Sequence, residues 1–259
     1  MTKIMISKKD LQKFLLSFGK GLPDVRLSCT GARITAEIAY SSFYLRKTLP
    51  ILKEGITEEG TLHIADLQKL LKFIKAAKSD FIELRQTDSE KPLHAISGGN
   101  KLQLPSTNHL ESSSKVPTIR KMLASGSESD WSTMGDMEFT AHGTVDATDL
   151  TALGEMRTLV SKESNFRLRL HAGESEFGMV AGKAASGRLF TTLPISNAEG
   201  PNATVQSNFG EWLPSCLEYL DEAPVRIHMG DGTLVIFEQA NTLMMVVDCL
   251  LYTSDAADE

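Results

Sequence analysis

Apolar residues with the spacing of an amphipathic helix occur twice in the first half of the chain. In residues 6–20, ISKKDLQKFLLSFGK, these residues are Leu11, Phe14, Leu15 and Phe18. In residues 64–78, IADLQKLLKFIKAAK, they are Leu67, Leu70, Leu71 and Ile74. At about 100° per residue each set forms one face of a helix, so each segment is predicted to pack on a core through that face.

The second half repeats this order at a nearly constant spacing. Residues 145–160, VDATDLTALGEMRTLV, predict a helix whose Asp149-Leu150 pair corresponds to Asp10-Leu11, and residues 207–223 predict a second helix. Short alternating or β-branched runs, typical of strands, follow the predicted helices. They are 25–29, 33–39, 43–49, 61–63, 81–87, 93–96 and 101–105 in the first half, and 166–171, 176–182, 188–194, 225–229, 233–239 and 242–248 in the second, where a further run at 137–142 precedes the helix that begins at 147.

This repetition indicates a duplicated α+β domain, with two helices packed on antiparallel sheets in each copy. We expect the copies to be residues 1–106 and 135–248, joined by a Ser-rich polar connector at 107–134. Residues 249–259, CLLYTSDAADE, resemble the translation of the transposon mosaic-end adapter used to prepare sequencing libraries. We therefore leave them out of the fold, and expect Cys249 not to be native and the native C-terminus to be missing.

Composition narrows the classes of function. The chain has 259 residues, of which 41% are hydrophobic and 23% charged, as in ordinary soluble domains. It has no apolar run near the roughly 18 residues of a membrane span and no signal peptide, so we expect a cytoplasmic protein without a membrane partner. The net charge of −6 means that any contact with nucleic acid must rely on a local basic patch. Three cysteines without CxxC spacing indicate reduced thiols.

Motifs of catalysis or metal binding are not found in the sequence. The six histidines show no HExxH or paired-ligand spacing, and His171 and His228, at the ends of predicted strands, are expected to be structural. Residues 178–187, GMVAGKAASG, resemble a phosphate loop, but the spacing of the glycines is one residue short and Ala184 replaces the Ser or Thr that would hold magnesium. There is no GxSxG nucleophile elbow. We expect no enzymatic activity, no cofactor and no metal.

The order of helix, three strands, short strand, helix and three-stranded meander, used twice, resembles the sliding clamps of DNA polymerases. The resemblance covers residues 1–248. Within this family the chain is similar to the two-domain clamps, namely proliferating cell nuclear antigen and the clamps of tailed bacteriophages. Three stretches of the sequence support the resemblance to the sliding clamps: ISKKDLQKFLLSF, GTLHIADLQKLLKFIK and EWLPSCLEYL. In the last of these Pro214 interrupts a predicted helix.

The resemblance implies a processivity factor that acts by topology. Three two-domain chains would form a closed homotrimeric ring around duplex DNA, with helices lining the hole and edge strands pairing across subunit boundaries. The ring would tether a replicative DNA polymerase after a clamp loader had placed it on DNA. If the chain is encoded by a phage, it would work in the cytoplasm of a bacterial host.

Basic residues opposite the apolar helix faces are the candidates for contact with DNA. Lysines suit contact that is independent of base sequence, because an ammonium is a point charge that needs no fixed geometry. The candidates are Lys9, Lys13, Lys20, Lys69, Lys72, Lys75, Lys78 and Arg157. The alternative is a solvated helix face without a ligand. The second domain does not fit the expectation of an evenly basic hole. Its second predicted helix carries four acidic residues: Glu211, Glu218, Asp221 and Glu222.

Two further interpretations stay open at this stage. Clamps recruit partners through short peptides that dock in an apolar pocket beside the connector, and Ile119, Met122 and Leu123 are the candidates for that pocket; local packing of the connector is the alternative. For the whole chain, the alternatives to a ring are a non-ring processivity subunit of the same fold and a phage structural or assembly protein without a role on DNA.

Overall fold

Two units make up the computed structural model, one of residues Met1–Tyr40 and Leu45–Val116, the other of residues Ser41–Tyr44 and Pro117–Glu259. The structure describes residues 1–18, 22–40, 43–51, 55–107, 110, 114–124, 131–155, 166–171, 176–183, 187–200, 216–230 and 234–247. None of the helices in these ranges has the length and hydropathy that a membrane span requires.

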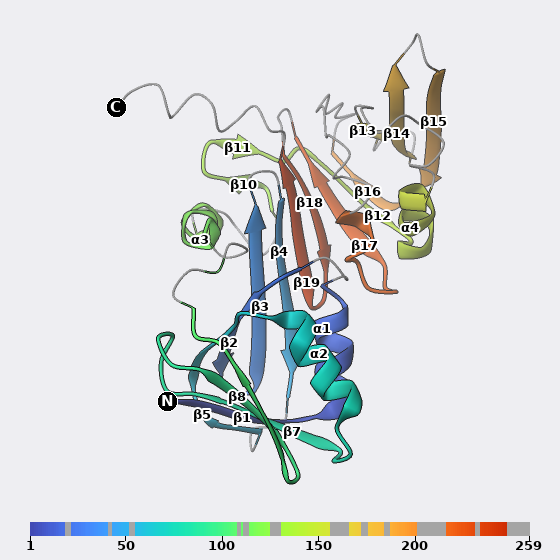
Figure 1. The fold of residues 1–259 in the computed structure, drawn as a ribbon. Coiled ribbons are helices and arrows are strands. Elements are labelled where there is room, and N and C mark those ends of the chain that lie inside the picture. Colours follow the sequence, from blue (N-terminus) through green and yellow to red (C-terminus); the bar gives the residue numbers. More distant parts are fainter. Residues whose placement is uncertain are drawn as a thin grey trace. The chain divides into compact units, whose positions relative to one another are not determined.

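The first unit contains two helices and two antiparallel sheets, shown in Figure 1. The helices are α1 (Lys8–Leu16) and α2 (Leu67–Ala76). The strands are β1 (Thr2–Ser7), β2 (Val25–Thr30), β3 (Arg33–Tyr40), β4 (Phe43–Pro50), β5 (Ile56–Glu58), β6 (Gly60–Ile64), β7 (Phe81–Gln86), β8 (Leu93–Ser97) and β9 (Asn100–Leu104). One sheet has the order β5-β1-β7-β8-β9, and the other contains the run β4-β3-β2-β6.

The core of the first unit follows from the alternation of its strands. On β1 and β7 the residues Ile4, Ile6, Ile82 and Leu84 are buried, whereas Met5 and Phe81 face outward and are 45% and 56% exposed. Period-two alternation puts every second side chain on the same face, so one face of the sheet is available to bury the helices. The turn between β8 and β9 uses Gly98 at φ 57, a left-handed conformation that glycine adopts without steric cost.

The second unit repeats the order of elements of the first. Its principal helix is α4 (Ala147–Glu155). Its strands are β12 (Ala141–Val145), β13 (Phe166–His171), β14 (Glu176–Lys183), β15 (Gly187–Pro194), β16 (Ser196–Glu199), β17 (Val225–Met229), β18 (Leu234–Gln239) and β19 (Thr242–Val247). The run β16-β12-β17-β18-β19 matches β5-β1-β7-β8-β9 strand for strand, and β13-β14-β15 matches β2-β3-β4 in sequence order. The prediction of a duplicated α+β fold with antiparallel sheets is therefore confirmed.

Some elements were not predicted from the sequence. The short strands β5 and β16 have too few residues to show alternation. The segment predicted as a connector contains the helix α3 (Val116–Ala124) and the strand β10 (Thr133–Met134), which forms a small hairpin with β11 (Met137–Glu138) just beyond the segment. The two units divide within this segment, and its exact bounds at 107–134 stay a prediction. Of the helix predicted at 207–223, only the end is described, where Cys216 and Leu217 are buried.

The start of α2 provides a test of the fold. Asp66 is the N-cap residue of α2, and its carboxylate accepts a hydrogen bond from the backbone N–H of Lys69 at 2.8 Å. We expect Asp66→Ala to lower the free energy of unfolding by about 1 kcal/mol, because an N–H at the start of the helix loses its partner. Asp66→Asn, which keeps an acceptor, should retain most of the stability. Denaturant titration of the three proteins measures both effects, and equal losses in the two variants would contradict the cap.

Candidate nucleic-acid interface

The helix α1 presents lysines because its other face is buried. It begins at the N-cap residue Ser7, whose hydroxyl accepts from the backbone N–H of Asp10 at 3.4 Å. The predicted apolar face is buried, and Phe14 also makes an edge-on ring contact with Phe18 at 5.5 Å between centroids. Lys9 and Lys13, on the remaining surface, are exposed. One turn of helix separates them, so they point to the same side.

The helix α2 is built in the same way. Leu67, Leu70 and Ile74 are fully buried along one face. Lys69, Lys72 and Lys75 are exposed, and Lys78, two residues beyond the helix, is exposed as well. Successive steps of three residues turn the helix by about 300°, so each lysine is offset by about 60° from the one before, and the three lie along an arc of about 120° on the exposed side of the helix.

The two basic helices lie side by side in the first unit (Figure 1). The backbone N–H of Lys8 donates to the carbonyl of Asp80 at 2.8 Å, and the ammonium of Lys8 donates to the carbonyl of Ala77 at 2.5 Å. The start of α1 is thereby joined to the end of α2. Of the eight predicted basic residues, the structure brings six together on this helix pair. Lys20 and Arg157 lie outside the described residues.

Nearly all the charged residues of α1 and α2 are basic. Within α1 and α2 the one acidic residue is Asp10. The helix α4 in the second unit is different, since it carries Asp149 and Glu155 and no basic residue. A phosphate backbone would be attracted to the surface of α1 and α2 and not to that of α4. Among α1, α2 and α4, the basic residues thus lie on the two helices of the first unit.

The residues predicted for a partner pocket lie on α3. Ile119 and Leu123 are buried, with 4% and 3% of their surface exposed, and Met122 is half-buried. The spacing of Ile119 and Leu123 by four residues places them on one face of the helix. This burial favours the alternative of local packing, whereas the partner pocket stays a prediction.

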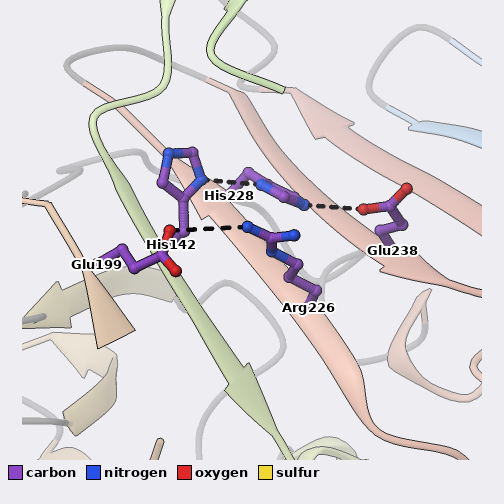
Figure 2. A network of polar contacts seen from close by, with 5 residues as sticks. All are labelled: His142, Glu199, Arg226, His228 and Glu238. Carbon is purple, nitrogen blue, oxygen red and sulfur yellow. Dashed lines mark hydrogen bonds and ion pairs between the residues drawn. The ribbon is translucent and has the colours of Figure 1, made fainter. Parts of the chain in front are cut away.

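A polar network in the second unit was not found by sequence reasoning. Figure 2 shows His142 on β12, His228 on β17 and Glu238 on β18 in a row, with an ion pair of Glu199 and Arg226 beside them. The Nδ1 atoms of His142 and His228 are 2.9 Å apart, and Nε2 of His228 is 3.1 Å from a carboxylate oxygen of Glu238. The fully buried His228 is therefore hydrogen-bonded at both ring nitrogens, which confirms the structural role expected for it. No sequence signal could have paired residues 86 positions apart.

The environment of Glu238 shifts its acidity. Burial alone would raise the pKa of this carboxyl, but its hydrogen bond with His228 and the nearby charge of Arg226 outweigh burial and lower the pKa. Because the carboxylate is ionised, it accepts from Nε2–H of His228. Between the two Nδ1 atoms one ring donates and the other accepts, and the tautomers of His142 and His228 decide which. Each of these nitrogen and oxygen atoms thus has a hydrogen-bond partner within the network, and none of them is left open to coordinate a metal ion.

Nucleophilic and metal-dependent chemistry finds no support in the described residues. Cys29 and Cys216 are free and buried, and burial raises the pKa of each thiol to about 12, so neither forms the reactive thiolate. In the described part of the chain no three His, Cys, Asp or Glu residues come together as metal ligands. The candidate site in the described residues is therefore the basic surface of α1 and α2.

The sequence matches no family model and no curated protein. The structure, by contrast, is similar to solved structures of clamps over 95% of the chain. The proliferating cellular nuclear antigen of Entamoeba histolytica matches with a TM-score of 0.64 at 13% identity, and the chain covers 98% of that protein. The DNA polymerase sliding clamp of Bacillus subtilis matches with a TM-score of 0.67 at 12% identity. The β clamp of Helicobacter pylori bound to a DNA ligase peptide matches with a TM-score of 0.65 at 15% identity.

These similarities define the fold. The duplicated α+β architecture is that of the DNA clamps, and the chain has the sliding-clamp fold. It spans 64% of the Bacillus subtilis clamp, 66% of the Helicobacter pylori clamp and 98% of the Entamoeba histolytica protein.

The network around Glu238 predicts a specific dependence of stability on pH. A carboxyl whose pKa is lower in the folded state stabilises that state above its unfolded pKa, and this contribution is lost as the pH falls through the folded pKa. We expect Glu238→Gln to be less stable than the parent at neutral pH, and the difference to shrink once the pH falls below the ordinary carboxyl pKa of 4.5 and passes through the lower pKa of the folded state. Denaturant unfolding at a series of pH values measures it.

A matched control is Glu199→Gln. Glu199 is 67% exposed and its ion pair with Arg226 is long, at 3.8 Å, so its removal should change the stability by less than about 0.5 kcal/mol at any pH. A stability difference for Glu238→Gln that stays constant down to low pH would contradict the proposed contribution of its ionised form.

Proposed function

We propose that this chain is a DNA polymerase processivity factor, the subunit of a ring-shaped sliding clamp that encircles duplex DNA and tethers the replicative polymerase. The observation that carries the proposal is the row of exposed lysines on α1 and α2, placed on a clamp fold whose apolar helix faces are buried. A non-ring processivity subunit and a structural protein without a role on DNA are the outcomes against which this is tested.

The charge of the chain fits a topological mechanism. Three copies of a chain with a net charge of −6 would carry −18, so most of the outer surface would repel DNA. The lysines of α1 and α2 would meet the phosphates from inside the hole through weak, mobile contacts. Such contacts allow sliding, because no base is read and each ammonium passes easily from one phosphate to the next. Retention on DNA would come from ring closure rather than from affinity.

Ring closure would use the open edges of two sheets. In the described part of the chain β9 pairs only with β8, and β15 pairs only with β14, so each strand leaves one row of backbone groups available. The edge strand β15 also carries Phe190, which is 68% exposed, the largest exposure among the described large apolar residues. We infer that β15 of one copy pairs with β9 of the next, and that Phe190 is buried in this contact.

The interface on β15 is tested by charge at Phe190. Phe190→Asp is expected to raise the concentration needed for assembly by about tenfold or more, because an apolar anchor at an interface is replaced by a carboxylate. Phe81→Asp is the matched control, since Phe81 is 56% exposed but lies on β7, which is inside its sheet between β1 and β8. Light scattering over a range of concentrations should show three times the chain mass of 28.3 kDa for the parent and for Phe81→Asp.

If the parent chain is monomeric at every concentration, the self-closing ring is wrong and the non-ring subunit becomes the better candidate. If Phe190→Asp assembles as well as the parent does, the ring can stand but the edge of β15 does not close it.

The role of the basic row is tested by reversing its charge. We expect the triple variant Lys69→Glu, Lys72→Glu, Lys75→Glu to reduce loader-dependent processive DNA synthesis by about tenfold or more, because three attractive contacts with phosphate become repulsive. All three side chains are exposed, so folding should be preserved and the circular dichroism spectrum unchanged. The control variant reverses Arg33 and Lys91, two exposed basic residues of the same unit outside both helices. Unchanged synthesis by the triple variant would remove α2 from the interface.

A further inference from the structure

Lys8, the first residue of α1, reaches across to the end of α2. Its ammonium donates to the carbonyl of Ala77 at 2.5 Å and lies 3.4 Å from the carbonyl of Lys75. Its backbone N–H donates to the carbonyl of Asp80 at 2.8 Å. The same residue therefore holds the end of the neighbouring helix through both its side chain and its main chain.

The carbonyls that Lys8 contacts are those that a helix leaves without an internal partner. The last four carbonyls of a helix have no N–H one turn ahead, and they form the negative end of the helix dipole. At the end of α2, the N–H of Ala77 goes to the carbonyls of Phe73 and Ile74. Ala77 itself is extended, with ψ at 135°, so the chain leaves the helix there. The ammonium of Lys8 supplies a donor and a positive charge to the part of this end that the backbone does not satisfy.

The neighbouring residue Lys9 differs in its surroundings. Lys9 is exposed, whereas Lys8 is partly buried against α2. No described residue accepts a hydrogen bond from the ammonium of Lys9 at the distances of a direct contact. Two adjacent lysines thus have different environments: one ammonium is engaged by the protein, and the other is available to a ligand.

We propose that Lys8 is a positioning residue of the basic surface and not one of its phosphate contacts. By capping α2 from the first turn of α1, it holds the last turn of α2, with Lys75 and the following Lys78, at a fixed distance from Lys9. A preorganised set of cations binds a phosphate backbone more tightly than the same cations on a mobile turn, because less conformational entropy is lost on binding. This inference rests on the proposed binding of DNA by α1 and α2.

The two roles have different signatures in the dependence of binding on salt. Each phosphate contact contributes about −0.9 to the slope of log K against log salt, whereas a residue that only positions other cations changes the affinity and leaves the slope as it was. The test uses the full chain and a fluorescein-labelled random-sequence duplex, with binding followed by fluorescence anisotropy between about 50 and 200 mM salt. The variants are Lys8→Met, Lys8→Arg and Lys9→Met.

We expect Lys8→Met to weaken binding several-fold at every salt concentration with the slope of the parent. Lys8→Arg, whose guanidinium can donate to both carbonyls, should restore the affinity. Lys9→Met should lower the magnitude of the slope by about 0.9. Hydrogen exchange provides a readout that is independent of DNA: protection of the Ala77 amide should fall in Lys8→Met and be retained in Lys9→Met.

The outcomes separate this inference from the proposed function. If Lys8→Met loses slope as Lys9→Met does, Lys8 is a phosphate contact and the inference is wrong. Parental affinity in Lys8→Met, combined with weakened binding by the Lys69, Lys72, Lys75 triple variant, would also overturn the inference while the proposed function stands. If neither Lys9→Met nor the triple variant, measured in the same assay, changes binding, the proposed contact of α1 and α2 with DNA fails, and the role of Lys8 on DNA fails with it.

Discussion

Burial of one apolar face on each of α1 and α2 is the interaction on which the candidate interface depends. Leu11, Leu15, Leu70 and Ile74 are fully buried, and burial of a side chain of this size contributes about 1.5–3 kcal/mol. With that face fixed against the core, the helical period leaves the lysines no place except the opposite surface. The positions of the charged residues are therefore a consequence of hydrophobic burial and not of any attraction among the charges, which repel one another.

A further consequence of this arrangement is that the two helices must be held beside each other. Neighbouring rows of lysines repel, so the pair needs a contact that keeps the helices together. Lys8 supplies such a contact, through its ammonium at the carbonyl of Ala77 and its backbone N–H at the carbonyl of Asp80. Here a cation that could have added to the repulsion is neutralised by the partial negative charge of a helix end. The scaffold thus lowers the cost of concentrating basic residues on one surface.

The two units show how one architecture can carry different electrostatics. They have the same strand order, yet α4 is acidic where α1 and α2 are basic. In the second unit the conspicuous polar feature is the row of His142, His228 and Glu238, which links three neighbouring strands and has the fully buried His228 at its centre. A fully hydrogen-bonded network of this kind specifies the register of the strands that it joins, because a slip of one residue would leave buried donors and acceptors without partners. The fold is duplicated, whereas the surface chemistry is not.

The sequence by itself determined the local features of this protein. The 3.6-residue period in 6–20 and 64–78 and the alternation in the strands are properties of neighbouring residues, so α1, α2, most strands and the exposed face that carries Lys9, Lys13, Lys69, Lys72 and Lys75 could be predicted. The repetition of these patterns also predicted the duplicated fold. Strands as short as β5 and the helix α3, within a polar segment, gave too weak a pattern.

Only the tertiary structure decided which distant residues meet. Lys8 and Ala77 are 69 positions apart, and His142 and His228 are 86 apart, and no local pattern encodes such a pairing. From sequence, Lys8 could not be distinguished from Lys9, because both are basic and adjacent. The difference arises from the helical turn of 100° between them, which points one ammonium at the carbonyls ending α2 and leaves the other in solvent. Packing of one element on another, and not residue type, assigned their roles.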